Sequence, residues 1–425
     1  MKKVLIISYY FPPSGGAGVQ RWLKMLKYLP QYGVEPIVLT VDEKYASYPQ
    51  VDKSLLNEIP SWLKIYKTKT REVLSLYKSV SPTKEIPYSG FANEPKPTFL
   101  QKVARFVRGN FFLPDPRKGW NRYAYQVACQ IIEKEAVDAV ITTSPPHSTQ
   151  LLGIKLKKRF PNLTWLADLR DPWTDIYYNK DLYQTGWAKA LNAKYEKKVL
   201  KKADHIITVS EDCARLFADK VDANLAMTVL PNGFDSDDFT CQTYAPTNDK
   251  KMLSYVGVFN EQYRADVLVD AIRKLPTACV DTLKLRFVGK VAQPVKVLLD
   301  TLPCQVEYID YVPHKQAVEY MCLTDMLLLC VPDIEQNKGI LTGKLFEYLA
   351  ARRPIVLLGP ADGDAANIIH ACEAGTCCRY DSDLLAAHLQ QLLTTPTVSL
   401  PNNDTYKQYS REACAQRLSE LLKSF

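Results

Sequence analysis

The feature of the sequence that most constrains the fold is a regular alternation of short apolar, β-like runs with amphipathic, helix-like stretches. This alternation is typical of a parallel sheet with helices on both faces. In the first half of the chain we expect strands over residues 4–8, 36–40, 139–143, 165–168, 205–209 and 227–230, and helices over residues 19–31, 148–158, 188–202 and 211–220. Residues 42–125 break the alternation with polar, Pro-rich and aromatic segments, which we interpret as an insertion.

The alternation resumes after a polar stretch over residues 240–251, which we interpret as a linker. We expect further strands over residues 253–256, 283–288, 306–309, 326–330, 355–358 and 376–379, and helices over residues 265–274, 295–301, 315–322, 344–351, 364–371 and 383–393. We therefore predict an α/β protein with two Rossmann-like, doubly wound parallel-sheet domains, residues 1–240 and 250–404, and a closing helix over residues 405–425. Two such domains would face each other across a cleft at the carboxyl ends of their strands.

The net charge of +8 is concentrated in the first half of the chain. Residues 1–240 carry 35 Lys and Arg against 25 Asp and Glu, whereas residues 241–425 carry 19 against 21. The first domain is therefore the one expected to meet an anionic partner. Within it, residues 99–114 place Lys102, Arg105 and Arg108 among large apolar residues, which is the composition of a segment that lies on a membrane surface. The same composition also fits an ordinary helix with a solvated basic edge.

The eleven cysteines form no CxxC pair and no His/Cys cluster at zinc spacing. We interpret them as reduced, mostly buried thiols, which favours a cytoplasmic protein. No apolar stretch approaches the roughly 20 residues of a membrane-spanning helix, and the apolar run near the N-terminus is better explained as a first strand than as a signal peptide. Asp237 and Asp238 are adjacent acids in a linker, so we predict no metal site.

A glycine-rich turn with Gly15, Gly16 and Gly18 lies between the first predicted strand and the first predicted helix. Glycines let the backbone approach a ligand closely, and the helix N-terminus beyond them offers unpaired N–H groups to an anion. The turn therefore indicates a phosphate-type site. A dinucleotide fingerprint would need a third glycine where Arg21 stands, so NAD is a weak match. The alternative is that the glycines serve only the turn.

A second candidate site begins the helix predicted over residues 344–351. Thr342 is placed to cap this helix with its hydroxyl, Gly343 keeps the first turn open, and Lys344 adds a charge at the positive end of the helix dipole. Together they would seat phosphate oxygens. Glu347 can accept two hydrogen bonds from a vicinal diol such as a ribose. The alternative is a carboxylate that only complements the helix dipole.

Two motifs follow strands of the first domain and should lie at the carboxyl edge of its sheet. The first, TTSPPH, ends in His147, which is either a sugar ligand or a structural residue. In the second, ADLRDPW, strand alternation directs Asp168 and Arg170 to the same side, while Asp171 begins the loop. The alternative to a catalytic Asp168 is a buried pair with Arg170 that supports the loop.

The second domain has its own strand, glycine turn and helix at residues 254–266. Gly257 permits close approach of a ligand, and Arg264 stands near the helix start as a bidentate clamp for a diphosphate. Lys290, which follows the next predicted strand, is a second candidate cation. The alternative for either cation is a solvated surface charge.

Seven short stretches, in order along the chain, resemble the retaining glycosyltransferases of the GT-B fold, in the large group called family four. They are YYFPPSGGAG, TSPPHS, ADLRDPW, ADHIITVSE, LPNGFD, YVGVFNEQYR and KLFEYLAARRPIV. The resemblance runs over nearly the whole chain and is weakest over residues 42–125. It implies that Gly16 faces the donor diphosphate, that Arg264 and Lys290 clamp it, and that Glu347 holds the ribose of a nucleotide sugar.

In many members of that family another Glu stands eight residues before the ribose-binding carboxylate, where this chain has Gly339. The resemblance implies that this missing Glu would contact the transferred sugar. Sugar recognition would then fall to the backbone of residues 337–341, and the identity of the donor sugar stays open.

The resemblance further implies a hexosyltransferase that moves a sugar, with retention, from a UDP- or GDP-linked donor to a hydroxyl of a saccharide or lipid-linked acceptor. It implies no cofactor and no metal. Many members act in bacterial envelope and capsule synthesis, so we expect surface-polysaccharide or glycoconjugate synthesis in the cytoplasm. The basic first domain would contact the inner membrane surface, and no nucleic acid would bind. Two alternatives stay open: a nucleotide-sugar 2-epimerase of the same architecture, and a non-catalytic assembly subunit, which Gly339 motivates.

Overall fold

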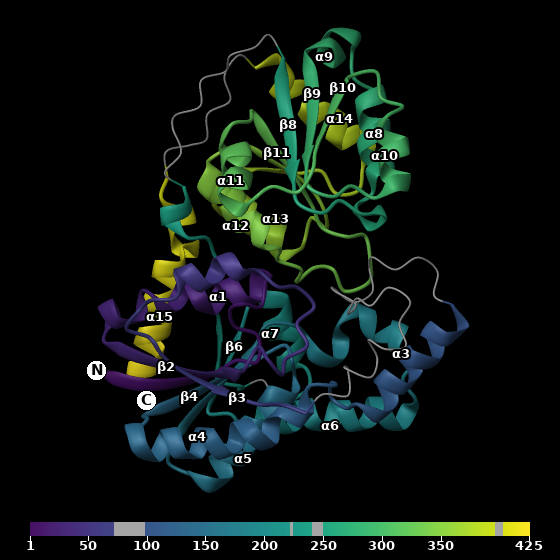
Figure 1. The fold of residues 1–425 in the computed structure, drawn as a ribbon. Coiled ribbons are helices and arrows are strands. Elements are labelled where there is room, and N and C mark those ends of the chain that lie inside the picture. The colour runs from purple at the N-terminus through teal and green to yellow at the C-terminus, as the bar shows by residue number, and fades with distance from the viewer. Residues whose placement is uncertain (72–97, 222–223, 240–249, 396–402) are drawn as a thin grey trace. The chain divides into compact units, whose positions relative to one another are not determined.

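The structure is a computed structural model, and it describes residues 1–71, 98–221, 224–239, 250–395 and 403–425. The chain divides into two compact units (Figure 1). Unit 1 comprises Met1–Pro231 and Cys414–Phe425, and unit 2 comprises Asn232–Ala413. Each unit is built around its own parallel sheet.

Unit 1 contains a seven-stranded sheet in the order β3-β2-β1-β4-β5-β6-β7, in which every neighbouring pair is parallel. The strands are β1 Lys2–Ile7, β2 Val34–Val41, β3 Lys64–Thr68, β4 Ala139–Ser144, β5 Thr164–Leu169, β6 His205–Thr208 and β7 Met227–Val229. The α-helices are α1 Ala17–Leu26, α3 Phe99–Phe111, α4 Asn121–Glu135, α5 Ser148–Arg159, α6 Gly186–Lys202, α7 Glu211–Ala218 and α15 Arg411–Lys423. Short 3-10 helices are η1 Leu29–Tyr32, η2 Lys53–Glu58, η4 Lys118–Trp120, η5 Trp173–Asp175 and η6 Tyr177–Leu182.

Strand β1 lies in the centre of this sheet and is buried on both sides. Its side chains alternate between two hydrophobic clusters, with Leu5 and Ile7 in one and Val4 and Ile6 in the other. The first cluster also contains residues of α4, α5 and α6, and the second contains residues of α1 and α15. A parallel strand covered on both faces is apolar at nearly every position, which is why this strand could be recognised in the sequence.

The C-terminal helix α15 packs against the sheet of unit 1, although the chain reaches it from unit 2. Its residues Cys414, Ala415, Leu418 and Leu422 belong to the same hydrophobic cluster as Val4. Their spacing of one, three and four residues places them on one face of the helix. The predicted closing helix therefore completes the core of the first unit.

Unit 2 contains a six-stranded sheet in the order β10-β9-β8-β11-β12-β13, again parallel throughout. The strands are β8 Lys251–Val256, β9 Leu283–Val288, β10 Gln305–Ile309, β11 Met326–Cys330, β12 Ile355–Leu358 and β13 Gly375–Cys377. The α-helices are α8 Ala265–Arg273, α9 Thr277–Thr282, α10 Gln293–Leu299, α11 His314–Cys322, α12 Gly343–Ala351, α13 Asp364–Ala371 and α14 Ser382–Thr394. The 3-10 helices are η7 Ser236–Asp238, η8 Glu261–Tyr263 and η9 Thr405–Tyr409.

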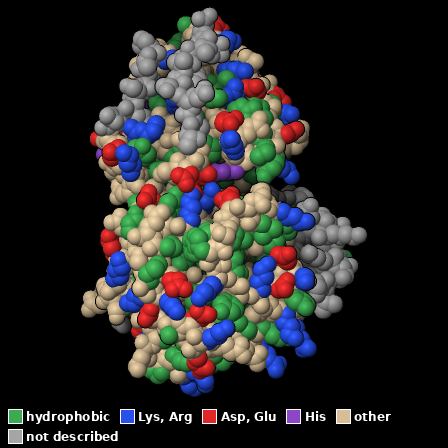
Figure 2. Space-filling model, turned by 60° about the vertical axis from the view of Figure 1, so that its left-hand side comes forward, with side chains coloured by type: hydrophobic (Ala, Val, Ile, Leu, Met, Phe, Trp, Pro, Cys, Tyr) green, Lys and Arg blue, Asp and Glu red, His purple; other side chains and the backbone are tan. Residues whose placement is uncertain are grey.

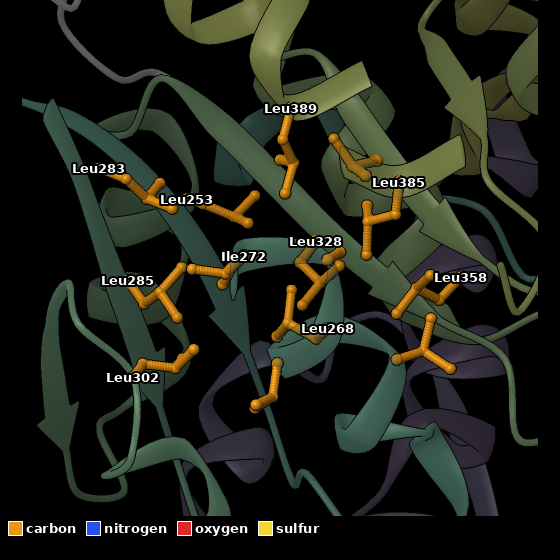
Figure 3. Packing of buried hydrophobic residues seen from close by; sticks show 14 of the residues in the cluster. Leu253, Leu268, Ile272, Leu283, Leu285, Leu302, Leu328, Leu358, Leu385 and Leu389 are labelled. Carbon is orange, nitrogen blue, oxygen red and sulfur yellow. The ribbon is translucent and has the colours of Figure 1, made fainter. Parts of the chain in front are cut away.

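Two hydrophobic clusters cover the two faces of the second sheet. Figure 3 shows one of them, in which Leu268 and Ile272 of α8 and Leu385 of α14 point toward strand residues such as Leu253 and Leu328. The other cluster holds residues of α11, α12 and α13. Helix α12, which carries the predicted Lys344 and Glu347, is thus anchored to the sheet by its apolar face.

The surface of the described chain is of mixed charge. On the face drawn in Figure 2, Lys and Arg side chains are interspersed with Asp and Glu. None of the helices in the described ranges is both long enough and apolar enough to cross a bilayer. The described residues also contain no group of three or more His, Cys, Asp or Glu side chains arranged to hold a metal ion.

The prediction of two doubly wound parallel sheets is confirmed, and most predicted strands agree with the observed ones within about two residues. Residues 42–125, interpreted as an insertion, contain β3, α3 and the start of α4 in their described parts. Strand β3 escaped prediction because it is an edge strand in which only Thr68 is buried, and it lacks an apolar run. The first helix, expected to reach residue 31, ends at Leu26, and a 3-10 helix that contains Pro30 follows it.

Candidate functional site

The strand orders locate the candidate sites. In each sheet the order reverses once, between β1 and β4 in unit 1 and between β8 and β11 in unit 2. Ligands of doubly wound sheets bind beyond the carboxyl ends of the strands at this reversal. The loops after β1 and β4 carry the glycine-rich turn and His147, and the loops after β8 and β11 carry Gly257 and the start of α12. The sequence motifs therefore lie where the topology expects ligands.

Helix α12 begins without the side-chain cap that the sequence predicts. Thr342 occupies the N-cap position, but its hydroxyl makes no capping hydrogen bond. The Thr342 Oγ1 atom is buried and has no hydrogen-bond partner among the described residues. The capping role predicted for Thr342 is therefore wrong, because the hydroxyl does not accept from the first-turn amides. Those amides and this hydroxyl stay available to a ligand beside Gly343.

Lys344 lies half-buried in the first turn of α12. Its Nζ donates to the Tyr255 hydroxyl at 3.0 Å and lies 5.0 Å from the centre of that ring and 5.9 Å from that of Tyr263. Burial lowers the pKa of Lys344 below its usual range. A desolvated ammonium held by aromatic rings gains strongly from an anionic ligand.

Gly257 has a positive φ of 128°. It also lacks a side chain for a reason that the sequence alone did not show. A Cβ atom at this position would lie 2.2 Å from Cε of Lys344, so the glycine leaves the space through which the lysine stem passes. The amide of Gly257 also donates to the Val288 carbonyl at 2.7 Å, which fixes the loop after β8. Gly257 therefore positions Lys344, besides permitting the close approach of a ligand that the sequence predicts.

Glu347 lies one turn further along α12 and is about one-fifth exposed. Its Oε1 atom is 2.9 Å from Nε2 of His314, the first residue of α11. The carboxylate is thus oriented by one imidazole and partly open to solvent, an arrangement that can still accept hydrogen bonds from a diol.

Arg264 is the cation that follows β8, and two carboxylates surround its guanidinium. Nε and Nη2 donate to Asp266 at 2.8 to 3.1 Å, and Nη1 donates to Asp333 at 2.6 Å. These hydrogen bonds raise the pKa of Arg264 above its usual range. Its side chain is 36% exposed, and those of the two carboxylates are 53% and 40% exposed. The structure thus confirms a cation near the start of α8, but one that is already paired.

Lys290 differs from Arg264 because its side chain is exposed and has no ion-pair partner within the described part of the chain. Its backbone carbonyl accepts from the Phe259 amide at 2.9 Å, which joins the loop after β9 to the loop after β8. The two predicted cations therefore stand on neighbouring loops of unit 2. The role of Lys290 as a second cation for the diphosphate stays a prediction.

The loop between β11 and α12 contains Gly339, and its neighbours anchor it. The Asn337 side-chain amide donates to the Pro332 carbonyl and to the Tyr380 hydroxyl at 2.9 and 3.0 Å. The carbonyl of Lys338 accepts from the Asp364 amide at 2.8 Å. The backbone just before Gly339 is therefore held in place by α13 and by Tyr380, which follows β13.

In unit 1, the glycine-rich turn packs against its own unit. Gly15 donates to the Gln50 carbonyl at 3.0 Å, and Gly16, with φ 104°, is the N-cap residue of α1. A Cβ atom at Gly18 would lie 2.2 Å from Nη1 of Arg170. The absent side chain at Gly18 therefore leaves room for a guanidinium group that reaches the start of α1.

Asp168 is a structural carboxylate. Its side chain is fully buried, and its oxygens accept hydrogen bonds from Arg21, Trp22 and Thr143 at 3.2, 3.0 and 2.7 Å. A carboxylate enclosed in this way cannot touch substrate, so the prediction of a catalytic Asp168 is wrong. The predicted alternative partner was also wrong, because Asp168 pairs with Arg21, while Arg170 donates from Nε to the Ser144 carbonyl at 2.8 Å.

His147 is buried against Trp173, with the two rings stacked 4.7 Å apart. Neither imidazole nitrogen has a hydrogen-bond partner in the described ranges, and neither has Nε1 of Trp173. Burial, with smaller contributions from Arg170 and Lys220, lowers the pKa of His147 to about 3. A neutral imidazole with both nitrogens unpaired is costly unless a ligand or water pairs with it. The role of His147 as a sugar ligand stays a prediction.

Asp171 lies in a partly buried, tyrosine-rich environment. Burial raises the pKa of its carboxyl group, and Arg170 opposes this shift. The charge of Asp171 in turn contributes to the raised pKa of Tyr177 and Tyr178, after their burial. The side of unit 1 that carries Asp171 thus combines a carboxylate, a guanidinium and aromatic rings, groups that can bind hydroxyl-rich molecules.

Three important neighbours were not singled out from the sequence: Tyr255, His314 and Trp173. Tyr255 is a buried polar aromatic in β8, and such side chains usually need a partner. His314 begins a helix directly after a strand and loop of the second sheet, which places it at the same edge as Glu347. Trp173 closes the ADLRDPW motif. Position in the topology, rather than spacing along the chain, could have identified them.

Comparison with known proteins agrees with this geometry. The family model described as Glycosyltransferase Family 4 matches residues 87–238, and that described as Glycosyl transferases group 1 matches residues 250–395. Among curated protein sequences, none matches the chain.

Solved structures with the same fold cover the whole chain. Sucrose-phosphate synthase from Thermosynechococcus elongatus is 15% identical, with a TM-score of 0.62 and coverage of 100% of this chain and 99% of that one. The Anabaena protein HepE in complex with UDP is 13% identical, with a TM-score of 0.62 and full coverage of both chains. WaaG, a glycosyltransferase involved in lipopolysaccharide biosynthesis, is 15% identical, with a TM-score of 0.52 and coverage of 98% and 95%. At these identities the likenesses show the fold, and together with the two family matches they show that the chain belongs to the glycosyltransferases of the GT-B fold.

Proposed function

We propose that this glycosyltransferase is a retaining hexosyltransferase that moves a sugar from a nucleotide-sugar donor to a hydroxyl group of a saccharide or lipid-linked acceptor. The observation that carries the proposal is the start of α12. One helical turn there contains three features: a helix N-terminus without a side-chain cap, the desolvated Lys344 ammonium and the partly exposed Glu347 carboxylate. This combination matches the two parts of a nucleoside diphosphate, an anion and a ribose diol.

The diphosphate would be bound by positive charge from unit 2. Lys344 and the first-turn amides of α12 provide a seat for phosphate oxygens. Arg264 must exchange Asp266 or Asp333 for phosphate in order to join them. Because these ion pairs are about one-third to one-half exposed, each is worth only about 0 to 1 kcal/mol, so the exchange costs little. Lys290 is the second cation that we assign to the diphosphate.

The ribose would be bound by Glu347. Its contact with His314 fixes the orientation of the carboxylate and leaves acceptor capacity for the diol. The complexes of HepE with UDP and with UDP-glucose support a uridine donor, although GDP-linked sugars fit the same groups. Gly339 offers no carboxylate to the transferred sugar, so the anchored backbone of residues 337–341 would recognise it instead.

For the reaction, the acceptor hydroxyl attacks the anomeric carbon while the bond to the diphosphate breaks. The cations of unit 2 stabilise the charge that develops on the leaving phosphate. That phosphate takes the proton of the acceptor hydroxyl on the same face, which gives retention without an enzyme nucleophile. We assign acceptor binding to unit 1, where Arg170, Asp171 and His147 stand at the edge of the sheet.

We further propose that the reaction needs no divalent metal and serves surface-polysaccharide or glycoconjugate synthesis on the cytoplasmic side of the inner membrane. The support is chemical: Lys344, Arg264 and Lys290 supply the positive charge that a metal supplies in other transferases. A lipid-linked acceptor would require the enzyme to work at a membrane surface.

The experiment is calorimetric titration of UDP and GDP into the parent protein and into Glu347→Gln. Loss of one to two charged hydrogen bonds, worth roughly 1.5 to 3 kcal/mol each, predicts affinity weakened about tenfold or more. Glu319→Gln is the matched control, because Glu319 is an exposed glutamate on α11. It should bind nucleotide as the parent does.

Unchanged affinity in Glu347→Gln, with a nucleotide that the parent binds, would contradict the assignment. A parent that binds neither nucleotide supports the non-catalytic alternative. Conversion of a nucleotide sugar into its epimer without acceptor, followed by NMR, would instead support the epimerase alternative.

A further inference from the structure

Helix α3 has an inverted distribution of polar and apolar side chains. Its exposed residues include Phe99, Leu100, Val103, Phe106 and Val107, which are 39 to 78% exposed. The side chains turned toward the protein are polar or small, among them Arg105, Gly109 and Asn110, all of which are buried. A helix that only covers a core would bury its apolar face. In α3 that face is left on the surface.

The polar face of α3 is fastened to the segment that leads into α6. The Asn110 side chain donates to the Tyr183 carbonyl at 3.1 Å and accepts from the Thr185 amide at 2.8 Å. A Cβ atom at Gly109 would lie 2.3 Å from the Leu182 carbonyl oxygen, so the two backbones are in close contact. Figure 1 shows α3 and α6 as neighbours in unit 1. These contacts therefore fix the orientation of α3, with its apolar face toward solvent.

The segment that holds the C-terminal end of α3, together with the start of α6, also exposes large apolar side chains. Trp187, in its first turn, is 66% exposed, and Tyr183 just before the helix is 42% exposed. Six lysines follow along α6, and all are exposed, whereas its one acidic residue, Glu196, is buried. Lys194 and Lys198 stand 7 and 11 residues after Trp187, which places them on the same side of the helix as the indole.

We propose that the apolar face of α3, Trp187 and the lysine stripe of α6 form a docking surface for a bilayer that contains anionic lipids. An amphipathic helix with large apolar side chains lies in the interface of a bilayer, and tryptophan is favoured there. Lysines near the surface are attracted by anionic headgroups. This charge complementarity distinguishes a lipid surface from a second copy of this chain, whose corresponding face would carry the same lysines and repel it.

The proposal extends the proposed function, because it names the surface through which unit 1 would meet the membrane of a lipid-linked acceptor. It is independent of the donor site, since none of its residues belongs to unit 2. The sequence pointed to Lys102, Arg105 and Arg108 among the apolar residues of α3, whereas the structure buries Arg105 and adds the exposed lysines of α6.

The test is flotation of the full-length protein with vesicles of phosphatidylcholine and phosphatidylglycerol in equal parts, and with phosphatidylcholine alone. We expect binding to the mixed vesicles that weakens with added salt. Val103→Glu/Phe106→Glu and Lys194→Glu/Lys198→Glu should each reduce the bound fraction about tenfold or more. The matched control for the apolar pair is Val297→Glu/Leu323→Glu, two exposed apolar residues of unit 2 that should leave binding unchanged.

Calorimetric titration of UDP and GDP and thermal melts of each variant separate the possible failures. Vesicle binding lost with melts and nucleotide affinity intact supports the proposal. A parent that does not bind the mixed vesicles overturns it, as does an equal loss in the unit 2 control. Light scattering that shows self-association of the parent, lost in these variants, would also overturn the proposal, because the face would then bind a second copy of this chain. A parent that binds vesicles but no nucleotide would contradict the donor site alone.

Discussion

The carboxyl edges of the two sheets have the same topology and similar residue types, yet their ion pairs differ in how far they are exposed to solvent. In unit 1, Arg21 and Asp168 form an ion pair whose side chains are 1% and 0% exposed. In unit 2, Arg264 pairs with Asp266 and Asp333, and all three side chains are at least 36% exposed. A charged residue after a strand is therefore not a site residue by position alone. Burial decides whether its partner can be exchanged for a ligand.

The energetic consequence follows from solvation. A buried ion pair cannot give up one partner without leaving an uncompensated charge in the interior. An exposed pair can, because water replaces the lost partner. The edge of unit 1 near Asp168 is thus a fixed frame, whereas the edge of unit 2 near Arg264 can rearrange around an anion. The following predictions test this contrast, from the largest expected effect to the smallest.

Replacing Arg21 by methionine should have the largest effect on folding. The substitution leaves the buried Asp168 carboxylate without its charged partner and removes the donors to the Leu230 and Pro231 carbonyls. We expect a loss of about 3 to 5 kcal/mol in the free energy of unfolding. Urea denaturation measures it. A loss below about 1 kcal/mol would mean that the buried and exposed pairs are equivalent after all.

Gly257→Ala tests how closely Lys344 depends on the loop after β8. The alanine must adopt a φ of 128° or shift the loop, and its Cβ atom would meet the lysine stem. Residues forced into such a conformation cost about 1 to 3 kcal/mol. We expect this loss in thermal denaturation together with weaker nucleotide binding. Nucleotide affinity equal to that of the parent would show that the position of Lys344 is unimportant.

His147→Phe tests the buried imidazole. The folded protein holds the pKa of His147 at about 3, below the ordinary value of about 6.5, so only the unfolded chain takes up a proton between these values. Its contribution to stability is therefore complete above pH 6.5 and falls by up to about 1.4 kcal/mol per pH unit down to about pH 3. Phenylalanine can keep the stacking on Trp173 and cannot be protonated.

The comparison to make is the slope of unfolding free energy against pH, from neutral pH to pH 5, in the parent and in His147→Phe. A shallower slope in the variant is expected. An identical slope would show that His147 can be protonated in the folded state. If the imidazole also contacts substrate, the variant should lose transferase activity at neutral pH while it stays folded.

Arg264→Gln should have the smallest effect on folding. The ion pairs that it breaks are exposed, so we expect a change of less than about 1 kcal/mol in unfolding free energy. Nucleotide affinity should nevertheless fall about tenfold or more if the guanidinium binds the diphosphate. The opposite pattern, a large loss of stability with unchanged affinity, would make Arg264 resemble Arg21 and remove the contrast between the two edges.

Prediction from sequence succeeded where a residue's role depends on its immediate neighbours along the chain. Central strands such as β1 and β11 are continuous apolar runs, and the glycine turns stand directly after strands, so both were recognised. The edge strand β3 was not, because its partner on one side and the solvent on the other leave no local apolar pattern. Thr342 was assigned as a cap because its position fits, although its hydroxyl points elsewhere.

Partner choice is the clearest example of what local pattern cannot supply. In the sequence, Arg21 is notable only because it stands where a dinucleotide fingerprint needs a glycine. Asp168 was predicted to pair with its near neighbour Arg170. The structure pairs Asp168 with Arg21 across 147 residues and pairs Glu347 with His314 across 33. Such pairs form because parallel strands bring their carboxyl ends together, whatever the distance along the chain.

By itself, the sequence determined the two parallel sheets, most of their strands and helices, and the loops in which the candidate site residues lie. These follow from apolar periodicity and turn chemistry, which act over a few residues. The tertiary structure alone decided which charges are buried and which are exchangeable, which side chain orients Glu347, and which face of α3 meets solvent. Those outcomes depend on desolvation and on contacts between distant segments, and no local pattern of residues encodes either.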